Sequence, residues 1–196
     1  YMKHLLLLLF FALPLLTTTA QKKTLDETPY LAGAVPEQNG MIVFAEHYDL
    51  PGKSRAELVA RLEHYVRSLV EVPEKLPTSR LTEVSPDSGV VAASVEEYLW
   101  FKRNSLVWDR ATVRYQLVVL AKEGAFDIMM RNIRYAYEPF DRNGEETFFP
   151  AEDWITDREA LKRNVRLTKV GGRKFRVKTI DRKNEIFAGA RRLFQD

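Results

Sequence analysis

Few residues of this chain have the types and the spacing that catalysis requires. None of its 196 residues is a cysteine, so thiolate nucleophiles, disulfides and zinc–cysteine sites are excluded. Neither a G-x-S-x-G nor an S-x-x-K pattern occurs. His47 and His64 lie in different predicted elements, and no H-E-x-x-H pattern is present. We therefore predict no catalytic residue, no metal site, no cofactor and no enzymatic activity, with a hydrolase as an open alternative.

The adjacent carboxylates Glu96 and Glu97 are a candidate pair for acid–base chemistry. They fall within a predicted strand, however, and neighbouring residues of a strand point to opposite faces of the sheet. The two carboxylates are therefore not expected to act on one substrate.

A different set of residues is typical of binding. Alternation along two predicted strands places Tyr98 and Trp100 on the face opposite the apolar set, with Arg114 and Gln116 on the polar face of the next strand. Aromatic rings and arginine on an open sheet face are the composition of many binding surfaces. The alternative is that residues of the C-terminal region cover this face as a second small core.

The C-terminal region is basic. Residues 156–196 contain thirteen Lys or Arg against five Asp or Glu, which is a net charge of +8, while the whole chain carries +3. Lys174 and Arg176 are its candidate binding residues. Such a region suits an anionic envelope component or an acidic face of an envelope protein, although a solvated charged surface is the alternative. We expect no nucleic-acid partner, because the chain is predicted to leave the cytoplasm.

The first residues predict export. Lys3 and His4 precede an apolar run from Leu5 to Leu16, and Ala20 stands at a suitable cleavage position. The run is shorter than the roughly 20 residues of a membrane-spanning helix. We predict a periplasmic or extracellular protein without a stable membrane span once the signal is removed, with an uncleaved anchor as the alternative.

Hydrophobic periodicity defines the remaining elements. A capping box, Ser54 with Glu57, opens a predicted helix over 54–70, and a second amphipathic helix is predicted over 179–195. A period of two predicts strands over 42–48, 80–85, 91–101, 113–119 and 126–137, with a bulge near 130–132 where the apolar parity flips. Residues 173–178 fit either an edge strand or the start of the last helix.

These elements predict an α+β fold, an antiparallel meander sheet of about five strands with helices packed on one face as a two-layer sandwich. The predicted divisions are a signal peptide over 1–20, a leader or linker over 21–39 and a core domain over 40–137. A loop and a basic helical extension that packs on the core follow over 138–196.

Several segments are shared with a known family. They are Tyr-Leu-Ala-Gly-Ala-Val-Pro at 30–36, Glu-Tyr-Leu-Trp-Phe-Lys at 97–102, Arg-Asn-Ile-Arg-Tyr at 131–135 and Lys-Phe-Arg-Val-Lys-Thr-Ile-Asp at 174–181. From about residue 30 onward the chain resembles an exported Bacteroidetes family of unknown function with a TBP-like fold. The resemblance implies an antiparallel sheet backed by helices, and it implies no activity and no functional residues. The fold name does not imply DNA binding, because fold does not determine function.

Two hypotheses of function follow from the sequence. The first is a non-catalytic binding module that uses the open sheet face and the basic C-terminal region. The alternative is a carrier that holds an apolar small molecule between the sheet and a long helix. A cavity at the sheet–helix interface would favour the carrier, and an uncovered aromatic face would favour the binding module.

Overall fold

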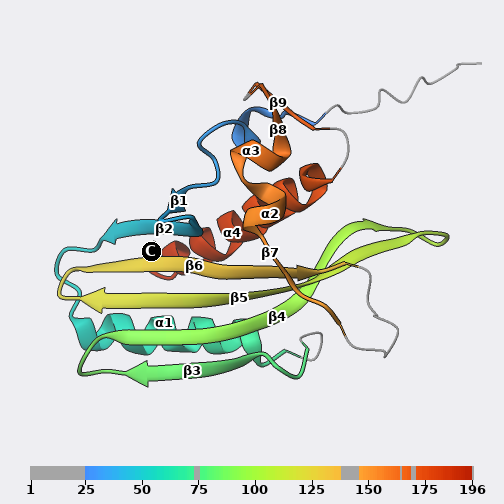
Figure 1. Cartoon of the computed structure of the whole chain (residues 1–196). Helices are drawn as coiled ribbons and strands as arrows, with labels where there is room; N and C mark the ends of the chain where they lie inside the picture. The colour runs from blue at the N-terminus through green and yellow to red at the C-terminus, as the bar shows by residue number, and fades with distance from the viewer. Residues whose placement is uncertain (1–24, 73–75, 138–145, 164, 169–170, 196) are drawn as a thin grey trace, which may run out of the picture.

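The computed structural model describes residues 25–72, 76–137, 146–163, 165–168 and 171–195, and the predicted signal peptide lies outside them. A seven-stranded antiparallel sheet forms the centre of the molecule (Figure 1). Its strands are β1 (Glu37–Gln38), β2 (Met41–Asp49), β3 (Arg80–Ser85), β4 (Val90–Arg103), β5 (Trp108–Lys122), β6 (Ala125–Ala136) and β7 (Phe149–Pro150). The expected number of about five was too low, because β1 and β7 have two residues each and leave no periodic signal in the sequence.

The strand order is β1-β2-β6-β5-β4-β3, with β7 paired to β6. Strands β3 to β6 form the predicted meander, in which each strand pairs with the next in the chain. The turn between β3 and β4 requires glycine at position 89, where φ is +76° and a Cβ atom would lie 2.0 Å from the Ala121 carbonyl oxygen. Strand β2 lies at the other side of the meander and pairs with β6.

The predicted bulge is present in β6. The register shifts from Arg131 opposite Gln116 to Arg134 opposite Arg114, so β6 contains one residue more than β5 over this stretch. Asn132 takes up the extra length with a φ of +52°, a left-handed conformation that asparagine tolerates better than most residues. The bulge therefore turns both Arg131 and Arg134 to the same face of the sheet.

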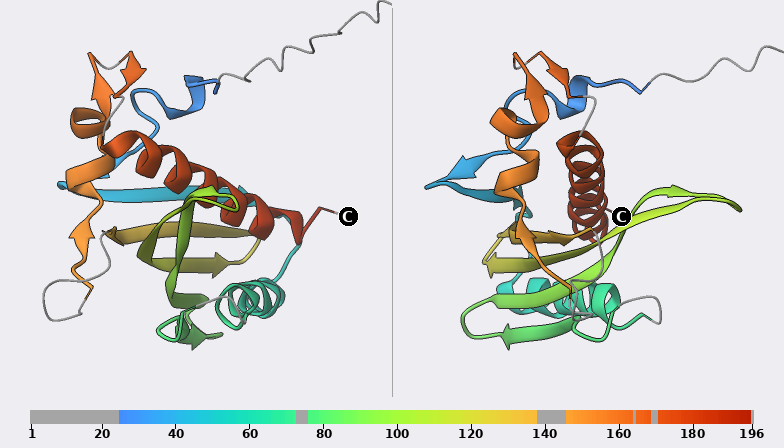
Figure 2. Two further views of the ribbon diagram at one scale, coloured as in Figure 1. Left: turned by 90° about the vertical axis from the view of Figure 1, so that its right-hand side faces the viewer. Right: turned by 45° about the vertical axis from the view of Figure 1, so that its right-hand side comes forward.

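Two long helices, α1 (Arg55–Val70) and α4 (Gly172–Arg192), lie on one face of the sheet, which we call the inner face (Figure 2). Helix α1 begins as predicted, with the Ser54 hydroxyl accepting the Glu57 amide at 3.2 Å. The helices approach closely where the Tyr65 hydroxyl donates to the Ile186 carbonyl at 2.8 Å. At Gly189 a Cβ atom would lie 2.1 Å from that hydroxyl, so any larger residue there would displace the Tyr65 ring.

Residues 173–178 are helical, so α4 begins earlier than the predicted residue 179 and the strand alternative is wrong. Short elements surround the start of α4: η1 (Thr28–Tyr30), α2 (Glu152–Ile155), α3 (Asp157–Ala160), and a small sheet of β8 (Leu161–Lys162) with β9 (Arg166–Leu167). The Tyr30 hydroxyl donates to Asp181 of α4 at 2.7 Å. The described part of the predicted linker over 21–39 is thus packed against the domain.

The described helices include none with the length and apolar character that crossing a membrane requires.

Candidate functional site

The face of the sheet opposite α1 and α4, here called the outer face, carries the four strand residues that the sequence singled out. Tyr98 and Trp100 lie on β4, and Arg114 and Gln116 lie on β5, all with the orientation that alternation predicted. Arg114 and Gln116 are exposed, whereas Tyr98 and Trp100 are half-buried. The outer face is turned toward the viewer in Figure 1.

Arginines cover the aromatic rings of this face. The Arg110 guanidinium lies 3.7 Å from the centre of the Tyr98 ring and 5.1 Å from that of Trp100. Arg103 lies 5.1 Å from the Trp100 ring, which in turn meets Trp108 edge-on at 6.0 Å. Guanidinium groups over ring faces are favourable cation–π contacts. The cluster is therefore a preformed surface of alternating rings and positive charges.

Further along the outer face, Arg114 is held in place by two neighbours. Its Nε donates to Glu96 at 2.5 Å, and its guanidinium lies 3.8 Å from the centre of the Phe148 ring. Phe148 belongs to the segment that leads into β7, and Glu146 of the same segment accepts the Thr112 hydroxyl at 3.0 Å. Residues 146–148 thus cover Thr112 and Arg114 in the middle of the outer face, as one alternative expected of the C-terminal region, while Tyr98 and Trp100 are half-buried.

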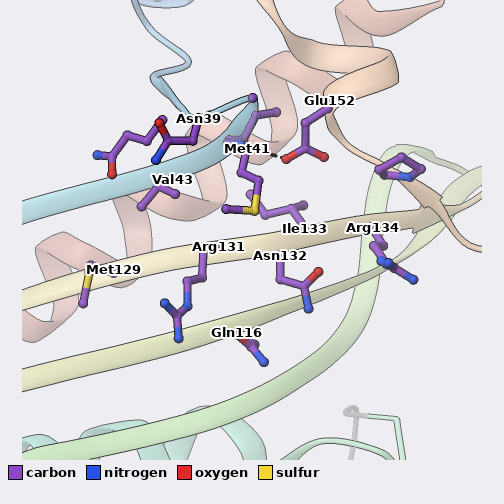
Figure 3. Close-up of a pocket in the computed structure, with 14 residues that line it drawn as sticks. Asn39, Met41, Val43, Gln116, Met129, Arg131, Asn132, Ile133, Arg134 and Glu152 are labelled. Carbon is purple, nitrogen blue, oxygen red and sulfur yellow. Dashed lines mark hydrogen bonds between the residues drawn. The ribbon is translucent and has the colours of Figure 1, made fainter.

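Beside this covered strip, the bulge opens a hollow of about 730 Å³ between β2, β6 and the segment from β7 to α2 (Figure 3). Arg131, Asn132 and Gln116 lie along one side, and Glu152 lies on the opposite side, where it accepts the Ile42 amide at 2.7 Å. Apolar side chains such as Met41, Val43 and Met129 complete the lining. The hollow joins apolar surface to positive charge.

The arginines around the hollow differ in whether a carboxylate pairs with them. Arg114 and Arg134 are directly opposite each other on β5 and β6, a like-charge arrangement that costs stability in a sheet. Glu96 pairs with Arg114 alone, so Arg134 has no carboxylate partner in the described part of the chain, and neither has Arg131. The lining of the hollow therefore contains two arginines, Arg131 and Arg134, against one carboxylate, Glu152.

The basic C-terminal residues lie elsewhere. Arg176 is fully buried, and its guanidinium donates to the carbonyls of Tyr30, Leu31 and Ile155 and to Asp157. Its prediction as a binding residue is wrong, because the helix turns this side chain toward the packed N-terminal segment. Lys174 is half-buried and pairs with Asp109 at 2.9 Å, so its charge is also used within the fold.

Glu96 and Glu97 point to opposite faces, as expected. Glu97 lies on the inner face, where Tyr115 donates to it at 2.7 Å and Arg182 at 2.9 Å. Burial, with a smaller contribution from the Glu97 charge, raises the pKa of Tyr115 well above its ordinary value. The cavity beside this group, between the sheet and α4, has a volume of about 10 Å³. It has room for one water molecule at most, and none for the ligand of the hypothetical carrier.

Sequence reasoning missed Arg131 and Arg134 as well as Trp108 and Arg110. The parity flip in β6 was the available signal for the first pair, since a bulge between two arginines three residues apart places both on one face. A run of large apolar residues at a hairpin turn was the signal for Trp108. In the described residues no three His, Asp or Glu side chains come together as metal ligands would.

The fold defined by this sheet and its two covering helices is a TBP-like fold. A model of the family described as a domain of unknown function (DUF4468) with TBP-like fold matches residues 44–136. The chain is 31% identical to a DUF4468 family protein from Bacteroides ovatus, with a TM-score of 0.79 over 88% of this chain and 97% of that one. The protein therefore belongs to the DUF4468 family, whose function is unknown.

A TBP-like protein from Parabacteroides distasonis shares the fold at 16% identity, with a TM-score of 0.65 over 83% of this chain and 97% of that one. No protein of curated function is detectably similar to this chain.

Proposed function

We propose that this protein is an exported, non-catalytic binding module that holds an amphipathic anion in the hollow at the β6 bulge. The observation that carries the proposal is that Arg131 and Arg134 border a partly apolar hollow and are not ion-paired in the described residues, while Glu152, the one carboxylate of the lining, accepts the Ile42 amide instead. A ligand with a carboxylate or phosphate group next to an apolar chain would satisfy both features.

The hollow complements an amphipathic anion in both charge and shape. Guanidinium groups form strong, often bidentate hydrogen bonds to carboxylates and phosphates. Met41 and Met129 are adaptable side chains that pack against irregular apolar groups. The amides of Asn132 and Gln116 add donors beside the arginines. A volume of about 730 Å³ lies within the range of small-molecule sites.

This proposal changes the sequence-based hypothesis in one respect. The open sheet face is retained, and the basic C-terminal region is not, since Lys174 and Arg176 are bonded within the fold. Export remains part of the proposal on the strength of the apolar run at Leu5 to Leu16.

Octanoate and octyl phosphate are suitable probes, with acetate and inorganic phosphate as controls that lack the apolar chain. We expect both octyl compounds to shift the amide resonances of β2 and β6 in NMR titrations, and the controls to bind far more weakly. Arg131→Ala and Arg134→Ala should each reduce the affinity about tenfold or more, because each removes a charge-assisted hydrogen bond.

Arg166→Ala is the matched control, because Arg166 is an exposed arginine on the separate β8–β9 sheet. Its affinity for the probes should equal that of the wild type. The proposal fails if neither octyl probe binds, or if Arg166→Ala weakens binding as much as the two substitutions in the hollow.

A further inference from the structure

The hairpin of β4 and β5 extends beyond the rest of the sheet (Figures 1 and 2). Strand β3 pairs with β4 only over Val90–Ser94, and β6 pairs with β5 only from Thr112 onward. Residues 100–110, here called the arm, therefore pair only with each other among the described strands. An arm of this kind is free to reach a surface that the body of the domain does not touch.

The tip of the arm is apolar and exposed. Leu106 is 92% exposed, Val107 41% and Trp108 68%, and these are consecutive residues. The turn is built to present them, since the Asn104 side chain accepts the amides of Leu106 at 3.0 Å and Val107 at 2.7 Å. Because the tip is convex, it cannot enclose a small molecule. It can instead insert into an apolar environment outside the protein.

A positive collar surrounds this tip. Lys102, Arg103 and Arg110 are exposed, and none has a carboxylate partner in the described part of the chain. The one acidic residue of the arm, Asp109, is already bound by Lys174 at 2.9 Å and by the Tyr137 hydroxyl at 3.0 Å. Basic residues favour anionic lipid headgroups, and tryptophan favours the boundary between headgroups and acyl chains.

The base of the arm is rigid. Phe101 packs on Phe175 of α4 with 4.7 Å between ring centres, and the Lys174–Asp109 ion pair ties the arm to the same helix. Phe101 lies on the inner face because it follows Leu99 by two residues in β4, and the register with β5 shifts between Trp100 and Lys102. The tip is therefore preorganised, and docking would require no refolding of the arm.

We propose that the arm docks this protein on an anionic lipid bilayer, with Leu106 and Trp108 inserted at the level of the headgroups. A sugar ligand fits less well, since Arg110 already covers the ring of Tyr98. A second copy of the chain also fits less well, because a symmetric tip-to-tip contact would bring two positive collars together. The inference is independent of the ligand proposed for the hollow, whose binding is measured without vesicles.

Vesicle sedimentation tests the inference. We expect the chain without residues 1–20 to bind vesicles of equal phosphatidylglycerol and phosphatidylcholine at least tenfold more tightly than vesicles of phosphatidylcholine alone. Leu106→Asp should weaken that binding tenfold or more, and Lys102→Gln with Arg103→Gln should reduce the preference for the anionic vesicles. Trp fluorescence should shift to shorter wavelength on binding, and Trp108→Phe should abolish the shift.

Val165→Asp is the matched control, because Val165 is 68% exposed and stands beside Arg166 on a different turn. It should bind as the wild type does, and circular dichroism should show all variants folded. The inference is overturned by equal binding to both vesicle types, or by a Leu106→Asp variant that binds normally. Sedimentation velocity that shows a dimer lost in Leu106→Asp would assign the tip to a second copy instead.

Discussion

Charged and aromatic side chains differ in burial and in partners between the two faces of the central sheet. On the inner face, Glu97 is buried and shares hydrogen bonds with Tyr115 and Arg182, while rings such as Phe175 pack on other rings. On the outer face, Arg131 and Arg134 lie exposed beside apolar surface, and guanidinium groups lie over the half-buried rings of Tyr98 and Trp100. The inner face uses these residue types to stabilise the fold, whereas the outer face keeps them available for contact.

The difference follows from what covers each face. Helices α1 and α4 remove water from the inner face, and an unpaired charge there would be costly. Among the described residues, the short segment 146–148 covers the middle of the outer face. Charges on the remainder of that face stay hydrated, so the fold tolerates them without partners.

The largest expected difference between the faces is in aromatic residues. Phe175 is buried with its ring centre 4.6 Å from Trp154 and 4.9 Å from Tyr135. Phe175→Ala should lower the free energy of unfolding by about 3–5 kcal/mol, since it leaves a cavity in the core. Trp108→Ala should change it by about 0.5 kcal/mol or less. Urea denaturation of both variants measures the contrast, and similar losses would show that the arm is part of the core.

A second contrast compares two arginines. Arg176→Met leaves three backbone carbonyls without their donor, and we expect a loss of roughly 2–4 kcal/mol in the free energy of unfolding. Arg134→Met should cost no more than about 0.5 kcal/mol, because its side chain is exposed and has no carboxylate partner among the described residues. Thermal and urea unfolding provide the test. A stability loss in Arg134→Met equal to that in Arg176→Met would remove the distinction between the faces.

The smallest effect concerns His47, an exposed residue of the outer face. Its ring nitrogens lie 2.6 Å from Asp127 and 3.2 Å from Asp49, and the hydrogen bond to Asp127 is the main cause that raises the pKa of His47. A raised pKa means that the folded state binds the His47 proton more tightly than the unfolded state does. This adds to the free energy of unfolding, and the whole contribution is present below about pH 6.5, the ordinary pKa of histidine. This contribution is lost as the pH rises through the raised pKa.

Unfolding measured between about pH 5.5 and 8.5 should therefore show a small decline in stability across neutral pH that is absent in His47→Gln. The NMR titration of the His47 ring should give a midpoint above about 6.5. A midpoint at or below that value would mean that Asp127 and Asp49 do not hold the protonated ring in solution.

Much of the architecture could be predicted from local patterns. Ser54 with Glu57 marked the start of α1, alternation marked β3 to β6, and the parity flip near Met130 marked the bulge. The elements that escaped prediction are the two-residue strands, which exist only through pairing with distant partners. For the candidate site, alternation placed Tyr98 and Arg114 on the correct face but could not show how far each is covered.

Arg176 illustrates why the rest could not be predicted. Alternation of Lys174, Arg176 and Lys178 with apolar residues fits a solvated strand, yet these residues form a helix whose arginine is buried. The carbonyls that hold its guanidinium belong to Tyr30 and Leu31, 146 and 145 residues earlier in the chain, and to Ile155. No local pattern reports such partners.

The sequence by itself determined which stretches alternate, where the helix over 54–70 begins and which strand side chains share a face, because these properties depend on neighbours within a few residues. Only the tertiary structure decided which charged side chains are paired within the fold and which remain exposed to solvent. That distribution depends on contacts between distant segments, on the covering of one sheet face by α1 and α4, and on the reach of the arm beyond its neighbouring strands.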